Sequence, residues 1–381
     1  MEISREILTR VNILDISLIL MYIVGIVALA RKFRSVSIKF VRLFTLIGIL
    51  HLLFTFLYYY LTLDNVADAI GYYRRVLYLY DSWGETFGQG TTFIYFTLYP
   101  LVKFFGLSYF GSYFIYSFLG LLGFYYLLNV LINITDKKWS NWFYILLLPN
   151  AHYWTVGIGK DSLIFFGISF LVYLYFFKKK WFLYIFPLLL VAFIRLHTLF
   201  FILTAFGATQ ILLNKTIKIS TKILVFVLLG GILFVLFPFL MARVGFVDTE
   251  SILSQFEDLA GQKIEGGSSI YMGDKTLLVK WLSYMFRPLF YDVFNVLSLI
   301  VSFENALWLA FFYKIFKNSR KKIQVKYQEF YWFTFSAVFF ITIPAAYLLY
   351  NLGIAVRQKT MIVPFLFILV FLSIFRLKKD I

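Results

Sequence analysis

Residues 157–180 read GIGKDSLIFFGISFLVYLYFFKKK: a Lys-Asp turn between glycines and an apolar run, closed by three lysines. The run at about 161–177 is close to the length with which a helix crosses a bilayer. Short cytoplasmic loops of membrane proteins are enriched in Lys and Arg, so the lysines indicate the cytoplasmic end. This stretch therefore predicts a membrane-spanning helix whose polar turn lies on the outer face.

The same arrangement recurs along the chain. Of the 381 residues, 61% are hydrophobic and 14% are charged, whereas soluble domains carry about a quarter charged residues. We expect an all-α polytopic membrane protein forming a single transmembrane domain over 1–381, with about eleven crossings, the N-terminus outside and the C-terminus inside. The expected spans are near 13–30, 43–61, 111–133, 141–156, 161–177, 181–194, 198–213, 223–241, 293–314, 328–350 and 358–375.

The net charge of +17 could indicate a nucleic-acid partner, but its distribution argues against one. The basic residues lie in short loops between apolar runs, which is the pattern of cytoplasmic loops in a multi-pass membrane protein. The chain has no cysteine, which excludes disulfides and thiolate metal sites, and its three separated histidines argue against a His-rich metal centre. The clusters are Arg31–Arg42, Lys137–Lys138, Lys178–Lys180, Lys215–Lys222, Lys317–Lys326 and Arg376–Lys379.

Two long outer loops follow from this topology, at 62–110 and 242–292. Within the first, segment 91–106 is interrupted by Pro100 and Lys103, and we expect an interfacial or re-entrant helix there. The second loop contains six acidic residues: Asp248, Glu250, Glu257, Asp258, Glu265 and Asp274.

Asp64 and Asp68 directly follow the second span and precede Arg74 and Arg75. Residues four apart share one face of a helix, so the two carboxylates could converge above the membrane. One of them could act as a general base, or both could hold a divalent cation near a phosphate. Such a cation is the possible cofactor. The alternative is a solvated helix in the loop.

Residues 149–161 form a segment broken by Pro and Gly that brings His152, Lys160 and Asp161 to membrane depth. Ionisable residues in a membrane are costly and usually face a polar cavity or a partner. The alternative is a Lys160–Asp161 turn that satisfies itself, with His152 at the interface.

Arg195 and His197 lie in a turn between two apolar runs, and Arg357 lies between the last two spans, next to Lys359. The planar guanidinium suits a phosphate ligand, and the alternative for Arg195 is an interfacial side chain that reaches toward water. Arg287-Pro288 is a weaker candidate. Asp15 and Glu304-Asn305, inside spans, are relay carboxylates or structural hydrogen-bond partners, with the structural role favoured.

The order of these motifs resembles that of the EpsG/Wzy-type polysaccharide polymerases and, more broadly, of GT-C-type membrane glycosyltransferases. The Asp/Tyr/Arg loop after the second span, the Lys160-Asp161 turn and the Leu196-His197 pair carry the resemblance, which covers about 40–215 and Arg357. The Arg-Gln turn and the Phe-His pair of EpsG-like proteins are replaced here.

The resemblance implies an enzyme that uses polyprenyl-(di)phosphate-linked sugars on the outer face, in cell-envelope or exopolysaccharide biosynthesis. Asp64 or Asp68 would be the base, while Arg195 and Arg357 would hold the lipid phosphate; Lys160, Asp161, His152, His197, Arg74 and Arg75 are further substrate-binding candidates. The expected partners are a polyprenyl-linked saccharide, membrane lipid and polysaccharide-assembly proteins. Two alternatives stay open: a transporter or flippase for a lipid-linked or anionic substrate, and a non-catalytic subunit of an envelope assembly complex.

Overall fold

A computed structural model describes residues 4–64, 67–224, 268–272, 274–318 and 323–376, together with Leu228 and Gly231. Within these residues the regular structure is helical, and the chain divides into two compact units, 1–195 and 196–381. Most of the expected span at 223–241 and the acidic residues from Asp248 to Glu265 lie outside the described residues.

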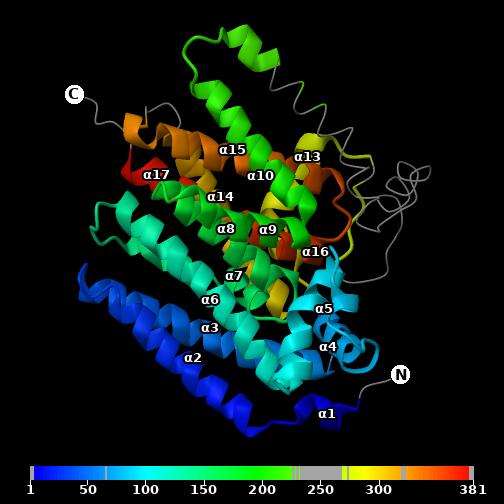
Figure 1. The fold of residues 1–381 in the computed structure, drawn as a ribbon. Helices are drawn as coiled ribbons and strands as arrows, with labels where there is room; N and C mark the ends of the chain where they lie inside the picture. Colours follow the sequence, from blue (N-terminus) through cyan, green and yellow to red (C-terminus); the bar gives the residue numbers. More distant parts are fainter. Residues whose placement is uncertain are drawn as a thin grey trace. The chain divides into compact units, whose positions relative to one another are not determined.

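The first unit is built around three long helices that lie side by side, α2 (Ile13–Arg31), α3 (Ile38–Asp64) and α6 (Tyr109–Ile134) (Figure 1). Asn12 caps α2 and exchanges hydrogen bonds with Asp15, and Ser108 caps α6, so both helices begin where the sequence supplies a cap. The unit also contains α1 (Arg5–Thr9), α4 (Asp68–Tyr78), η1 (Gly84–Thr86), α5 (Thr91–Tyr99), η2 (Pro100–Phe104), η3 (Asn141–Leu147), α7 (Pro149–Thr155), α8 (Lys160–Phe176), η4 (Trp181–Tyr184) and α9 (Ile185–Ile194).

Side-chain contacts establish the directions of these helices. At one end, Phe33 packs on Phe44 and Tyr125, so the end of α2 lies near the start of α3 and the last part of α6. At the other end, Tyr59 packs on Tyr109 and donates to the Leu8 carbonyl. The basic loops at 31–42 and 135–138 are therefore at the same end of the unit.

The next segments continue this alternation. Phe143 packs on Phe40 near the basic end, whereas Tyr153 packs on Tyr58, so η3 and α7 together return along most of α3. Tyr126 of α6 contacts both Phe170 and Tyr173 of α8, which runs parallel to α6 toward Lys178–Lys180. The consecutive elements η4 and α9 pack against α8 and return to the opposite end of the unit. We call this end the polar end and define it by Asp15, Gly157–Asp161 and Arg195.

The loop at 62–110 folds over this polar end. The Gly90 N–H donates to the Phe193 carbonyl, and the Phe93 ring stacks on the Phe193 ring near the end of α9. The helix α4 buries Tyr72 and Tyr73 on one face, and α5 continues directly into the π-helical turn η2. Segment 91–106 thus forms two short consecutive elements, and it is not among the helices long enough to span a membrane.

The second unit contains α10 (Leu196–Leu213), α13 (Leu277–Phe286), η5 (Phe290–Asp292), α14 (Val296–Asn318), α15 (Val325–Tyr347), α16 (Leu352–Gln358), η6 (Lys359–Met361) and α17 (Val363–Phe375). The Asn318 side chain donates to the Ser373 carbonyl, and the Gln324 N–H donates to the Arg376 carbonyl. These bonds gather the end of α14, the start of α15 and the end of α17. The basic side chains Lys317, Lys326 and Arg376 are therefore grouped at one end of this unit too.

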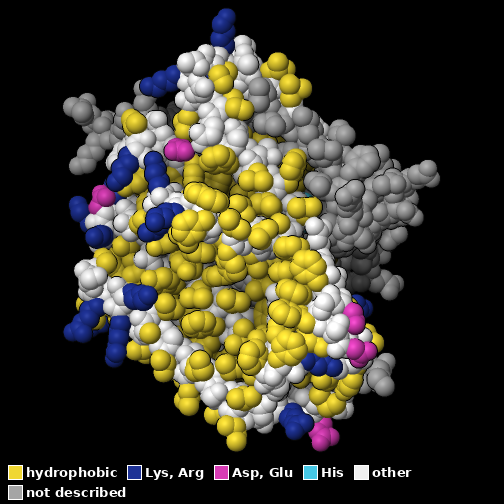
Figure 2. Space-filling view, in the orientation of Figure 1, with side chains coloured by type: hydrophobic (Ala, Val, Ile, Leu, Met, Phe, Trp, Pro, Cys, Tyr) yellow, Lys and Arg dark blue, Asp and Glu magenta, His cyan; other side chains and the backbone are white. Residues whose placement is uncertain are grey.

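Six helices in the described residues are long and apolar enough to cross a membrane: α2, α3, α6, α10, α14 and α15. A seventh results if the segment Leu352–Met361 and α17, which meet at 66°, form one broken span. The expected span at 141–156 is divided at Pro149 into η3 and α7, and the spans at 161–177 and 181–194 correspond to helices too short to meet the length for a membrane span. The predicted count of about eleven is thus not confirmed, whereas a multi-pass membrane protein is supported. Figure 2 shows hydrophobic side chains covering much of one face.

Candidate functional site

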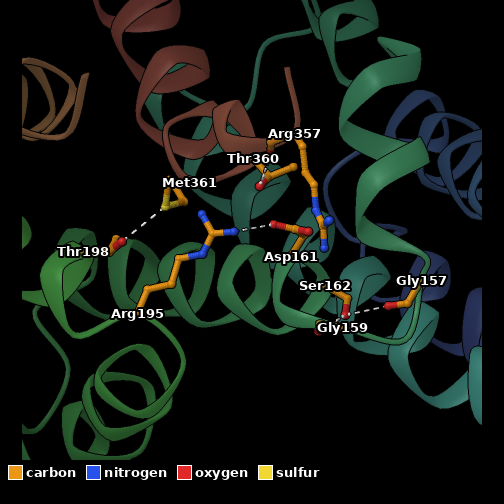
Figure 3. Close-up of polar contacts among 9 residues, drawn as sticks. All are labelled: Gly157, Gly159, Asp161, Ser162, Arg195, Thr198, Arg357, Thr360 and Met361. Atoms are coloured by element: carbon orange, nitrogen blue, oxygen red, sulfur yellow. Dashed lines mark hydrogen bonds and ion pairs between the residues drawn. The ribbon is translucent and has the colours of Figure 1, made fainter. Parts of the chain in front are cut away.

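The centre of the candidate site is an ion pair at the polar end of the first unit. One guanidinium nitrogen of Arg195 lies 3.0 Å from Oδ1 of Asp161, and their side chains are 13% and 4% exposed. Figure 3 shows the Arg195 side chain extending toward Asp161. Arg195 follows the last residue of α9, whereas Asp161 lies in the first turn of α8, where a negative charge is favoured by the helix dipole.

This contact changes two expectations. The Lys160–Asp161 turn does not satisfy itself alone, because Asp161 binds a residue 34 positions later. The packing of α8 against α9 brings Asp161 to Arg195. The small exposed fraction of Arg195 also argues against a side chain that simply reaches to the interface.

Glycines allow the turn before α8 to lie close to its neighbours. A side chain at Gly157 would collide with the Tyr58 ring, and one at Gly159 would contact the Tyr72 ring. The Ser162 hydroxyl donates to the carbonyls of both Gly157 and Gly159 and holds the turn against the start of α8 (Figure 3). The Asp161–Arg195 pair is therefore positioned by a tight backbone turn with tyrosines beside it.

The loop helices contribute further polar and aromatic groups. Arg75 of α4 donates a 2.8 Å hydrogen bond to the Tyr95 hydroxyl, and the Tyr72 ring packs on the same tyrosine. Because Tyr72 also lies beside Gly159, one aromatic contact links this loop to the turn that carries Lys160 and Asp161. Arg74 lies one position earlier on α4. Burial raises the pKa of Tyr73, on the inner face of α4, to about 12.

Asp64 and Asp68 do not share one helix face. The helix α3 ends at Asp64 and α4 begins at Asp68, so the expected i, i+4 geometry is wrong. Asp68 lies in a first helical turn, where the dipole favours a carboxylate. Asp64 forms an exposed ion pair with Arg5 at 3.0 Å. The roles of both residues as base or as cation ligands stay predictions.

The Asp15 side chain connects two helices through hydrogen bonds. Its carboxylate accepts hydrogen bonds from the backbone N–H groups of Asn12 at 2.7 Å and Ser108 at 3.4 Å. It therefore joins the starts of α2 and α6, as expected for a hydrogen-bond partner between helices.

The second unit contains a separate buried polar cluster, centred on Lys359. Its ammonium group donates to Oδ1 of Asn305 at 2.9 Å and to the Arg287 carbonyl at 3.4 Å. Asn305 also donates to the Pro288 carbonyl, and Glu304 on the same helix is buried. This cluster lies where η6 separates α16 from α17.

Arg287 extends the cluster through an ion pair with Asp292. Burial alone would raise the pKa of Asp292, but hydrogen bonds from Arg287 and the Leu289 N–H lower this pKa below its ordinary value. The sequence analysis identified Arg287-Pro288, Glu304-Asn305 and Lys359 as three unconnected candidates. Only the packing of α14 against the segment before it and against η6 brings them together.

The other predicted ligands lie in the second unit. His197 is in the first turn of α10, where its ring packs on Phe201, and Arg357 is near the end of α16, where its carbonyl accepts a hydrogen bond from Thr360. The binding of one lipid phosphate by both Arg195 and Arg357 stays a prediction.

Sequence reasoning missed the meeting of His51 and His152. Their rings contact each other in the interior of the first unit, although the residues are 101 positions apart. His51 lies within an expected apolar span, far in the sequence from the other two histidines. A polar ring within such a span is costly without a partner, and this is the signal that could have indicated one.

Among the described residues, no group of three or more His, Asp or Glu side chains is arranged to hold a metal ion. Comparison of the chain with protein-family models, curated proteins and solved structures finds no match.

Proposed function

We propose that the chain is a multi-pass glycosyltransferase of the bacterial cytoplasmic membrane, with about eleven crossings and a GT-C-like arrangement. It would transfer or polymerise sugars carried by polyprenyl phosphate or diphosphate on the outer face. The observation that carries the proposal is the buried Asp161–Arg195 pair at the end of the first unit opposite its lysine-rich loops. A buried ion pair is a poor source of stability compared with apolar packing, so its presence at membrane depth favours a functional role.

The chemistry of this end fits the parts of a lipid-linked sugar. A guanidinium carries five N–H donors in one plane, and this planar shape matches a phosphate. Tyrosine rings beside the turn offer flat apolar surfaces next to polar hydroxyl groups. In the reaction, an acceptor hydroxyl would attack the anomeric carbon, the bond to the lipid phosphate oxygen would break, and the hydroxyl proton would pass to a carboxylate.

Three carboxylates are candidates for this base. Asp64 and Asp68 follow from the sequence, and Asp161 is added by its position beside Arg195. Oδ1 of Asp161 accepts a hydrogen bond from the Arg195 guanidinium at 3.0 Å. Asp161 then serves best as the group that orients Arg195, while Asp64 or Asp68 accepts the proton.

Binding of the carrier lipid provides the first test. The purified protein in nanodiscs would be titrated with undecaprenyl phosphate, with Arg195→Lys as the test variant and Lys103→Gln as the control at an exposed cation of η2. Loss of a charge-assisted hydrogen bond costs about 1.5–3 kcal/mol, so Arg195→Lys should weaken binding about tenfold to a hundredfold. Equal affinities for the wild type and Arg195→Lys would remove the phosphate role.

Turnover provides the second test. Lipid-linked saccharides extracted from bacterial membranes would be incubated with the protein, and the released polyprenyl phosphate or diphosphate would be measured. Asp64→Asn and Asp68→Asn should separate the base from the other residue, since loss of a general base lowers the rate by about two to four orders of magnitude. Near-wild-type release by both variants, at equal protein levels, would leave neither as the base.

One observation favours a transporter or flippase as the second candidate. The segments Leu352–Met361 and Val363–Phe375 meet at 66°, with buried Lys359 at the break. Transporters often place substrate sites at such interrupted helices. Movement of a fluorescent lipid-linked saccharide across vesicles, without release of the carrier lipid, would support this candidate over the transferase.

A further inference from the structure

Two histidine rings contact each other through their nitrogen atoms in the interior of the first unit. Nδ1 of His51, on α3, lies 2.9 Å from Nδ1 of His152, on α7. Both residues are fully buried, and the Phe124 ring stacks on His152 with 4.3 Å between ring centroids. The separation of the two nitrogens is an ordinary hydrogen-bond length, so one of them has to donate a proton to the other.

The remaining ring nitrogens each face a backbone carbonyl. Nε2 of His51 lies 3.1 Å from the Ser117 oxygen, and Nε2 of His152 lies 2.8 Å from the Leu146 oxygen. A carbonyl only accepts, so both Nε2 atoms must carry hydrogen if these contacts are hydrogen bonds. A neutral imidazole has one N–H. Three contacts therefore require three N–H groups, whereas two neutral rings supply two.

We propose that His51 and His152 form a buried proton-binding site that takes up one proton and shares it between their Nδ1 atoms. With this proton, all three contacts are hydrogen bonds. Without it, two lone pairs face each other at 2.9 Å, or one carbonyl loses its donor. Addition or removal of this proton therefore changes the contact between α3 and α7.

Among the described residues, no carboxylate contacts either ring, so no opposite charge fixes the proton there permanently. In the described part of the chain, the polar contacts of both rings are with each other and with the two carbonyls. Phe54 and Phe124 cover the rings, and Phe165 of α8 packs on Phe124. The titratable side chains next to these neighbours are tyrosines: Tyr22 of α2, hydrogen-bonded to Ser117, and Tyr153 of α7, which packs on Phe54.

One member of the pair, His152, lies close in sequence to the candidate site. The helix α7 ends at Thr155, and the turn that carries Asp161 follows directly. A change in the α3–α7 contact is therefore transmitted along a few residues of backbone to that turn.

A metal ion fits the pair less well than a proton. Zinc binds imidazole nitrogen at about 2.0 Å in tetrahedral geometry, which places two ligand nitrogens more than about 3 Å apart. The observed separation is 2.9 Å, and among the described residues no third His, Asp or Glu side chain completes a site.

Nitrogen NMR of the whole protein tests the proposal. The chain has three histidines, so imidazole-labelled protein in nanodiscs gives few signals, and His197→Gln identifies the one outside the pair. As the pH is lowered from neutral, we expect uptake of one proton by the pair and a scalar coupling between the two Nδ1 atoms. His152→Asn should lose both the coupling and this uptake, while His197→Gln should keep them.

Three outcomes would overturn the proposal. The rings could titrate as two independent histidines, or they could stay neutral at every pH at which the protein is folded, with one Nδ1–H donating to the other nitrogen. Stoichiometric metal in the purified protein, lost in His152→Asn, would assign the pair to a metal ion instead. Because the decisive spectra come from the wild type, they do not depend on whether a variant folds.

Discussion

Removal of one partner of the Asp161–Arg195 pair should reveal how strongly the polar end depends on it. In Arg195→Gln, the Asp161 carboxylate stays 4% exposed and loses the guanidinium at 3.0 Å. Breaking a buried pair from one side typically costs about 3–5 kcal/mol because the remaining buried charge loses its hydrogen-bonded counter-charge. Arg195 retains some exposure to solvent, so we expect a loss near the lower end, about 3 kcal/mol.

The double variant Asp161→Asn/Arg195→Gln separates this electrostatic effect from a loss of packing. It removes both charges and keeps side chains of related shape, so it should be more stable than Arg195→Gln alone. The expected coupling energy from the double-mutant cycle is about 2 kcal/mol. The free energies of unfolding would be measured in mixed micelles by titration with a denaturing detergent.

The chain provides a matched control in the Arg5–Asp64 pair. Its atoms are also 3.0 Å apart, but its side chains are 67% and 64% exposed. An exposed pair contributes about 0–1 kcal/mol, so the same cycle at these positions should give little coupling. Similar coupling energies for both pairs, or a double variant less stable than Arg195→Gln, would refute the electrostatic reasoning.

Three further predictions concern other parts of the chain. Cysteines introduced at Ser82 and Ser268 should react with an impermeant thiol reagent in intact cells; protection of either, once it reacts in permeabilised cells, would break the predicted topology. The lowered pKa of Asp292 means that its ion pair with Arg287 stabilises the fold at pH values above the unfolded pKa of about 3.9 and that this stability is lost as the pH falls through the folded pKa. Asp292→Asn should therefore weaken the acid dependence of thermal unfolding, and an unchanged acid profile would contradict this. Gly120→Ala should cost about 1–3 kcal/mol because its Cβ would collide with a backbone carbonyl of α7, and a melting temperature equal to that of the wild type would show that α7 moves aside without cost.

Local features of the sequence were sufficient for the membrane class and for part of the architecture. Apolar runs and basic loops predicted the long helices α2, α3 and α6, because hydrophobicity and charge act on each segment before any tertiary contact forms. Within the first unit, the contacts place its lysine-rich loops at one end, as the alternation of loops implied. Span lengths were less predictable, since Pro149 and the glycine turn interrupt apolar sequence without making it polar.

The candidate site was only partly visible in the sequence. Lys160, Asp161 and Arg195 were recognisable as charges at membrane depth, but the Asp161–Arg195 bond depends on how α8 packs on α9. Asp64 and Asp68 seemed to share a face because their spacing fits a helix, whereas the helix ends between them. The His51–His152 contact joins residues 101 positions apart, and Lys359 meets Asn305 across 54 positions. The sequence alone determined which residues are costly to place in a membrane; only the tertiary structure decided their partners, because a hydrogen bond or ion pair requires atoms within about 3 Å and local spacing does not specify contacts between distant segments.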